Sequence, residues 1–190
     1  MTTSPCASSR GITLIEVLVV VALLGIVAAL VAPSFQGMLA RQRVQGINAE
    51  LVGDIQFVRS QVIARNDRVR ITFGSNANMT CYTIHTSAVT GTCRCTETPG
   101  RACLKPDGSA WEGVNEIKTV QIRRETSVTV SPSPLPRILF DVPDGRPNRS
   151  DFRVDVASSR GGTMRTSVGT TGRPVACSPD GSITGAPACP

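Results

Sequence analysis

The sequence has 190 residues, of which 41% are hydrophobic and 4% aromatic, and its formal net charge is +6. So few aromatic residues exclude a core built on aromatic rings, and valine, isoleucine and leucine must fill it instead. The length leaves room for one domain of modest size rather than several.

Residues 1–11 are small and polar, and Arg10 carries their one formal charge. A positive charge beside an apolar segment is typical of the cytoplasmic side of a membrane. We therefore expect a short cytoplasmic leader over residues 1–11, with the rest of the chain beyond the apolar segment lying outside the inner membrane.

An apolar run extends from Ile12 to Ala32, and Glu16 is its only charged residue. As a helix this run would be ~31 Å long, close to the ~30 Å hydrocarbon core of a bilayer. A buried core helix would normally have a polar face, so we expect a transmembrane helix over residues 12–33. An ionised carboxylate inside a membrane is costly unless it is paired, so Glu16 indicates a function. Pro33 has no N–H to donate and crowds the preceding turn, which predicts a helix kink.

The segment Gly11–Glu16 has the sequence GITLIE. Together with the apolar helix and Pro33, it resembles the class III signal of type IV pilins and type II secretion pseudopilins. The resemblance implies that a prepilin peptidase cuts between Gly11 and Ile12 and that Ile12 is then methylated, although phenylalanine is the usual first residue. In a filament, the carboxylate of Glu16 would neutralise the α-amino group of a neighbouring subunit. An ordinary secretory signal would be shorter, would lack the acid and would end in a small-x-small site.

Beyond the apolar run the helical pattern continues over residues 34–66, with apolar residues at steps of three and four. These positions are Val44, Ile47, Leu51, Ile55, Val58 and Val62. The charged residues Glu50, Asp54 and Arg59 lie largely off this stripe. We expect an amphipathic continuation of the helix that packs on a protein core and ends near residues 65–67, where Asn and Asp favour a turn.

After Asp67 the pattern changes to short, β-branched segments bounded by turn residues. The expected strands are Arg68–Phe73, Thr80–His85, Ile117–Arg123, Ser127–Ser131, Arg137–Val142, Phe152–Ala157 and Thr163–Val168. A helix followed by many short strands predicts an α+β fold, in which the long N-terminal helix packs on an antiparallel β-sheet in a domain over residues 67–190. The three prolines of Ser131–Pro136 predict a stiff connector that forms no β-ladder. Residues 57–66 and the pair Gly172-Arg173 resemble the GspH/FimT branch of minor pilins and pseudopilins.

Cys6 would be lost with the leader, which leaves an even number of cysteines: Cys81, Cys93, Cys95, Cys103, Cys177 and Cys189. An even number in an extracytoplasmic domain favours disulfides. Of the fifteen pairings that six cysteines allow, the simplest joins Cys177 to Cys189 and pairs the other four among themselves. Cys93 and Cys95, which are one residue apart, are not expected to bond to each other.

Metal binding and catalysis find less support in the sequence. A zinc site from Cys81, Cys93, Cys95 and Cys103 would contain Cys-x-Cys rather than the usual Cys-x₂-Cys, with only His85 to supplement it. We expect His85 at the surface or half-buried in a strand. Hydrolase, metalloprotease and phosphate-loop motifs are absent from the sequence, so we expect neither an enzyme nor a cofactor.

Arginines are dense in the C-terminal third, at positions 146, 149, 153, 160, 165 and 173. Several lie in loops rich in glycine and serine that would suit phosphates, although aspartates nearby could pair with them. Some FimT-type pilins, which this region resembles, bind DNA through a Gly-Arg-x-Arg motif near the C-terminus. Here Gly172–Val175 lacks the second arginine, so Arg165 and Arg173 are the candidate DNA contacts.

The resulting prediction is a minor pilin or pseudopilin of a type II secretion pseudopilus or a type IV pilus, between which the sequence does not choose. Its expected partners are a prepilin peptidase, the inner membrane and other pilins in a filament. It would span the inner membrane once, with its C-terminal domain in the periplasm, before it enters the filament. The alternative is a DNA-binding minor pilin for DNA uptake in natural transformation.

Overall fold

A computed structural model describes residues 13–86 and 93–190 of the chain, apart from the side chains of residues 32 and 33. Its elements are helix α1 (Leu14–Arg65), a 3₁₀ turn η1 (Arg124–Thr126) and strands β1 (Val69–Ser75), β2 (Met79–Thr86), β3 (Glu116–Arg123), β4 (Val128–Ser133), β5 (Arg137–Asp141), β6 (Arg146–Pro147), β7 (Phe152–Ser158), β8 (Gly162–Val168) and β9 (Pro174–Cys177). The chain divides into two compact units between Gln36 and Gly37. The predicted α+β class is confirmed.

Helix α1 is continuous through Pro33 in its backbone assignment, and the kink expected there stays a prediction. Thr13 precedes the first turn, and the backbone N–H of Glu16 lies 3.3 Å from the Thr13 hydroxyl oxygen. This hydroxyl caps the helix by accepting from one of the N–H groups that have no partner inside the helix. The helix ends at Arg65, where Asn66 has a left-handed φ of 50°, a conformation that asparagine tolerates better than most residues.

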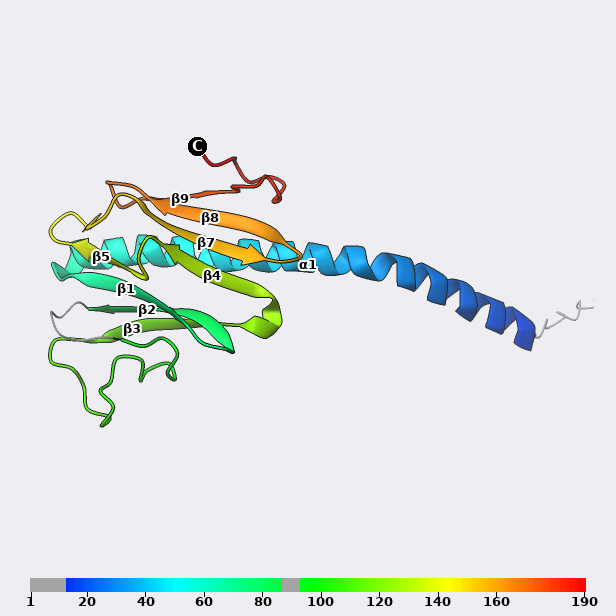
Figure 1. Ribbon diagram of the computed structural model, residues 1–190, viewed down its shortest axis with the longest axis horizontal. Helices are drawn as coiled ribbons and strands as arrows, with labels where there is room; N and C mark the ends of the chain where they lie inside the picture. The colour runs from blue at the N-terminus through cyan, green and yellow to red at the C-terminus, as the bar shows by residue number, and fades with distance from the viewer. Residues whose placement is uncertain (1–12, 87–92) are drawn as a thin grey trace, which may run out of the picture. The chain divides into compact units, whose positions relative to one another are not determined.

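Within the unit 37–190, the apolar stripe of α1 packs into the core. The stripe residues Val44, Leu51, Ile55, Val58 and Val62 are fully buried. They are joined in one cluster by alternate residues of the strands, such as Ile71 in β1 and Val154 in β7. Figure 1 shows the cyan part of the helix running along both groups of strands. The apolar residues of the helix, spaced at three and four, and those of the strands, spaced at two, therefore form one core.

Two antiparallel sheets are present in the described part of the chain, with strand orders β3-β2-β1-β5-β6 and β4-β7-β8-β9. An aromatic contact connects them, since the ring centroids of Phe73 in β1 and Phe152 in β7 are 5.9 Å apart. Phe73 also lies 5.6 Å from Tyr82 of β2, in its own sheet. The backbone N–H of Val130 in β4 also donates to the hydroxyl of Thr80 in β2, at 3.1 Å. The antiparallel domain is thus split into two sheets that share one interior.

Three strand features differ from the sequence expectation. The connector at Ser131–Pro136 was expected to form no ladder, but β4 continues to Ser133 and Pro132 pairs in register with Val154. Because β4 is an edge strand, the missing N–H of a proline can face away from the neighbouring strand. Strands β6 and β9 were not predicted. Each is short, lies at the edge of its sheet and contains a proline, so neither leaves a clear alternating pattern.

Candidate functional site

The N-terminal part of α1 is apolar and has no protein cover in the structure. The stretch Leu14–Val31 is long and apolar enough to span a membrane, and none of it is buried. Leu14 is 83% exposed and Leu30 is 74% exposed. Exposed apolar area of this extent is unfavourable in water, so the helix requires lipid or other protein surfaces around it.

The predicted assembly residue Glu16 lies in the first turn of this helix and is exposed. Its spacing from Thr13 is that of a capping box, in which a first-turn acid accompanies a capping hydroxyl. The helix dipole also favours a negative charge at this end. The two processing residues, Gly11 and Ile12, lie outside the described residues.

Polar contacts inside the domain attach the second half of α1 to both sheets. Asp54 is only 8% exposed, although the sequence placed it off the apolar stripe. Its carboxylate accepts from the hydroxyl of Tyr82 at 2.7 Å and from the ammonium of Lys118 at 2.8 Å. On the other sheet, Thr166 donates to the side-chain carbonyl of Asn48 at 2.8 Å, and both residues are buried. These contacts fix which face of the helix the domain binds.

Burial and hydrogen bonds shift the pKa values of Tyr82 and Lys118 in this network. Burial raises the pKa of Tyr82 well above its ordinary value, and its hydrogen bond to Asp54 adds to the shift. Partial burial opposes the charged form of Lys118, but hydrogen bonds to Asp54 and Glu50 outweigh it and raise its pKa. At neutral pH the network therefore holds a protonated tyrosine and a charged lysine on one buried carboxylate.

All six cysteines of the domain form disulfides in the structure. The bonds join Cys81 to Cys95, Cys93 to Cys103 and Cys177 to Cys189. The first two attach the segment 93–115 to strand β2 and close it on itself. The third links the end of β9 to the C-terminal tail. A zinc site on the first four cysteines would need their thiolates, which these bonds consume.

His85 lies beside the Cys93–Cys103 disulfide and is 1% exposed, so the expectation of a surface or half-buried position was wrong. The segment that contains Cys93 and Cys103 covers the outer face of β2, which buries this strand on both faces. The ring nitrogen Nδ1 donates to the carbonyl of Thr86 at 2.8 Å, because a carbonyl can only accept. Nε2 is then free to accept from the Thr72 hydroxyl at 3.0 Å. Burial lowers the pKa of His85, which suits a neutral structural histidine.

The two arginines proposed as DNA contacts have different surroundings. Arg165 in β8 donates two hydrogen bonds to Asp155, its cross-strand neighbour, at 2.7 and 2.9 Å. Arg146 and Arg149 likewise form ion pairs with aspartates. Arg173 forms no ion pair among the described residues and lies in the loop before β9. At least half of the arginines that suggested a phosphate-binding surface are therefore already paired.

Arg173 lines a pocket of about 410 Å³ with Arg59 of helix α1, and Arg165 is not part of its lining. The Nε atom of Arg59 is buried, with no acceptor among the described residues. Gly172 has a left-handed φ of 73°, and a Cβ there would lie 3.3 Å from Arg59 Cδ and 2.7 Å from the carbonyl oxygen of Gly145. A larger residue at position 172 would collide with this backbone. No sequence pattern connects Arg59 with Arg173, which is 114 residues away.

Comparison with protein families gives two matches. Residues 6–32 match the prokaryotic N-terminal methylation motif, which covers the predicted cleavage site and most of the apolar helix. Residues 49–181 match the family described as type II transport protein GspH. Neither the curated proteins nor the solved structures gave a match.

Proposed function

We propose that this chain, which belongs to the GspH family of type II transport proteins, is a pilin-like subunit that is cut by a prepilin peptidase and assembled into a filament. The peptidase would cut between Gly11 and Ile12, and Ile12 would be methylated. The filament would be a type II secretion pseudopilus or a type IV pilus. In this role the protein acts by assembly rather than by catalysis.

The exposed apolar helix carries this proposal. The 18-residue apolar stretch Leu14–Val31 has no buried part, lies within the matched methylation motif and holds an acid in the first turn of its helix. In the membrane, lipid would cover this stretch. In a filament, the same stretches of neighbouring subunits would cover one another, which removes their apolar area from both water and lipid.

The disulfides support a periplasmic position for the domain. Structural disulfides persist in oxidising compartments such as the periplasm and are rare in the cytosol. The disulfides among the described residues lie in the part that follows the helix, from Cys81 to Cys189. An inner-membrane protein with a single span and its C-terminal domain in the periplasm would have this arrangement.

Glu16 would set the register between subunits. Its carboxylate would pair with the methylated amine of Ile12 in a neighbouring subunit, so that neither charge stays unpaired in an apolar surrounding. The Glu16 side chain forms no hydrogen bond or ion pair with the described residues, which supports this role because its carboxylate is available to a neighbouring subunit.

A second candidate function is DNA binding during uptake. The observation that favours it is the pocket that Arg59 and Arg173 both line, next to Gly172. Arginine pairs suit phosphate oxygens, and such contacts bind DNA without reading its sequence. The pairing of Arg165 with Asp155 counts against a wider basic surface.

Co-expression with a prepilin peptidase tests the processing step. We expect intact mass and N-terminal sequencing to show a chain that starts at Ile12 and carries one added methyl group. Gly11→Ala should block the cut, while the matched change Gly25→Ala, at a helix position with open space around it, should leave it unaffected. Retention of residues 1–11 by the unchanged protein in a competent host would contradict the proposal.

A further inference from the structure

Residues 94–111, which precede β3, form a pocket that the proposed filament role does not use. Its lining includes Arg94, Glu97, Arg101, Leu104, Lys105 and Trp111, and its volume is about 400 Å³. Pockets of ~300–1,000 Å³ are the usual size for binding small molecules and short segments of other molecules. The pocket lies wholly within the unit 37–190.

The pocket is held rigidly by the domain. The Cys81–Cys95 disulfide ties its segment to β2, and the Cys93–Cys103 disulfide closes the segment on itself. The side chain of Gln121 in β3 donates to the backbone carbonyls of Cys95 and Glu97 at 2.8 and 2.7 Å. The carboxylate of Glu116, also in β3, accepts from the N–H groups of Gly100 and Ala102 at 2.7 and 2.8 Å. A preorganised pocket loses little conformational freedom when it binds a ligand.

The charges of the lining favour an anion. Arg94, Arg101 and Lys105 form no ion pair with any described carboxylate, whereas several arginines elsewhere in the domain are paired. The nearby Asp107 is engaged by Ser109, whose N–H and hydroxyl donate to it at 2.8 and 2.7 Å. Three cations thus line one pocket whose only acid is Glu97.

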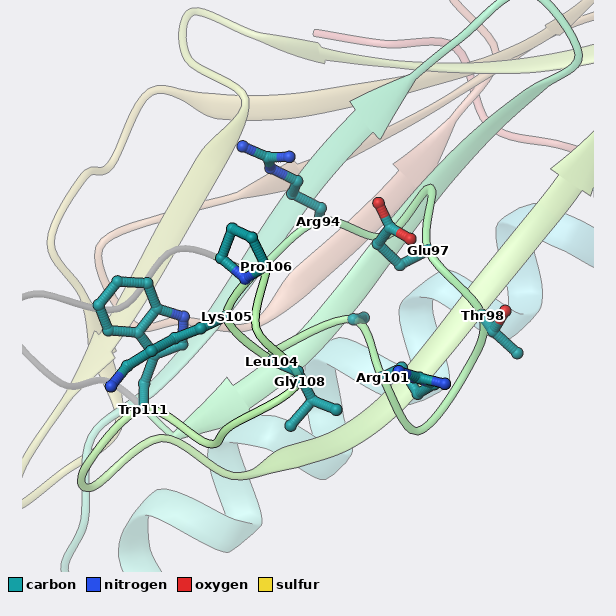
Figure 2. A pocket seen from close by; sticks show the side chains of 10 residues that line it. Arg94, Glu97, Thr98, Arg101, Leu104, Lys105, Pro106, Gly108 and Trp111 are labelled. Atoms are coloured by element: carbon teal, nitrogen blue, oxygen red, sulfur yellow. The ribbon is translucent and has the colours of Figure 1, made fainter.

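Trp111 adds a hydrogen-bond donor to the pocket. Its indole Nε1 is buried and has no acceptor among the described residues, which is costly for a donor. Figure 2 shows this nitrogen on the edge of the ring that faces the other lining residues, with Arg101 on the opposite side of the pocket. The Lys105 ammonium lies 5.2 Å from the ring centroid. A ligand in the pocket would place one oxygen at the indole N–H and other polar atoms toward the cations that line the pocket.

The same features distinguish a carboxylate from a nucleic acid. Lys105 covers one face of the Trp111 ring, which blocks that face for base stacking. Three acids, Glu97, Asp107 and Glu112, balance the three cations of the segment, so it offers no continuous basic track for a polyanion. Glu97 supplies an acceptor, which suits the N–H groups of a peptide and finds no donor on a phosphodiester backbone. Leu104 and Pro106 supply apolar contact for a neighbouring side chain.

We propose that this pocket binds an acidic peptide segment of a protein partner, with a carboxylate between Arg94, Arg101 and the Trp111 indole. The chain has a single tryptophan, so the indole N–H gives one signal that reports on the pocket directly. The processed full-length chain, labelled with ¹⁵N and held in detergent micelles, would be titrated with a short peptide that has glutamates on either side of a leucine and blocked ends. The indole signal should shift and saturate, and the affinity should fall with added salt.

Matched variants test the residues. Arg94→Gln/Arg101→Gln should weaken binding by at least about tenfold, because each charge-assisted hydrogen bond contributes about that factor. Arg94→Lys/Arg101→Lys should retain part of the affinity. Arg123→Gln/Arg137→Gln removes the same charge from exposed positions outside the pocket and should change nothing. An unchanged indole signal before titration shows that each variant is folded.

Several results would overturn the proposal. Equal binding of the matching glutamine peptide would show that the pocket does not recognise a carboxylate. An unchanged affinity in Arg94→Gln/Arg101→Gln would show that these two arginines do not bind the peptide. An equal or larger indole shift with succinate or with a short DNA duplex would assign the pocket to a free small acid or to nucleic acid instead of a peptide.

Discussion

Lys118 on strand β3 lies 2.8 Å from both carboxylate oxygens of Asp54 on helix α1, and this contact joins two elements that are 64 residues apart in the sequence. Asp54 is nearly buried, whereas the Lys118 side chain is 38% exposed. Solvent therefore partly screens the attraction between them. The main effect of Lys118 is to give the buried carboxylate of Asp54 a charged partner, because an unpaired buried charge would destabilise the fold.

The network predicts a loss of stability at alkaline pH. The pKa values of both Tyr82 and Lys118 are raised in the folded protein. Each group contributes stability that is fully present below its unfolded pKa, about 10 for both residue types, and is lost as the pH rises above it. The free energy of unfolding, measured with denaturant, should be level from neutral pH to about pH 9 and should then fall. Tyr82→Phe should cost about 1 kcal/mol at neutral pH and make the alkaline fall shallower. An equally steep fall in Tyr82→Phe would contradict this account.

The buried contact between Thr166 and Asn48 predicts a second stability effect. Thr166→Val keeps the shape of the side chain but leaves the buried carbonyl oxygen of Asn48 without its donor. We expect a loss of about 1–3 kcal/mol in the free energy of unfolding, by denaturant titration. Thr170→Val, at an exposed position, is the matched control and should stay within about 0.5 kcal/mol of the unchanged protein. Equal effects of the two changes would show that the contact does not matter.

Much of the fold follows from periodicity. The stripe from Val44 to Val62 is read at steps of three and four and is buried as predicted. Strands such as β1 and β7 alternate between buried and less buried residues, so their predicted bounds agree with the observed ones to within about two residues. Their signal is strong because the same apolar residues that define the period also face the core.

The remaining features depend on contacts between distant segments. His85 is buried because residues beyond position 92 cover β2, and Asp54 is buried because Tyr82 and Lys118 reach it. Arg59 and Arg173 meet only after the helix docks on the second sheet. In each case tertiary packing rather than local spacing determines the partner. The burial of these polar residues therefore cannot be predicted from their neighbours in the sequence.

Removal of the Cys177–Cys189 disulfide tests how the C-terminal tail is held. The bond closes a loop with a sequence separation of 12, and in the chain-entropy account a loop of that size contributes about 3 kcal/mol. Cys177→Ser/Cys189→Ser should lower the free energy of unfolding by about 2–4 kcal/mol. The indole signal of Trp111 should not change, because that pocket is held by other disulfides. A shift of that signal would show that the tail and the pocket are coupled.

The DNA-binding alternative gives different expectations for two arginines. Arg173→Gln should weaken retardation of a DNA duplex for all sequences alike, because contacts to phosphate do not read bases. Arg165→Gln should have a smaller effect, since Arg165 is held by Asp155. A gel-shift series at increasing salt measures both, and binding should weaken steeply as counterions are released. If the protein does not retard the duplex even at low salt, filament assembly remains as the single proposed role.

The central claim is that the Glu16 carboxylate pairs with the processed amine of a neighbouring subunit. Its most direct test is the fraction of mature protein found in sheared filaments, compared with the fraction left in the inner membrane, for the unchanged chain and for Glu16→Leu. We predict normal insertion and processing of Glu16→Leu but at least about a tenfold fall in the filament fraction, because the neighbouring amine would lose its partner. Glu16→Gln should behave similarly, and Glu125→Gln, which removes an exposed acid in η1, should assemble normally. Normal incorporation of Glu16→Leu into filaments would contradict the claim.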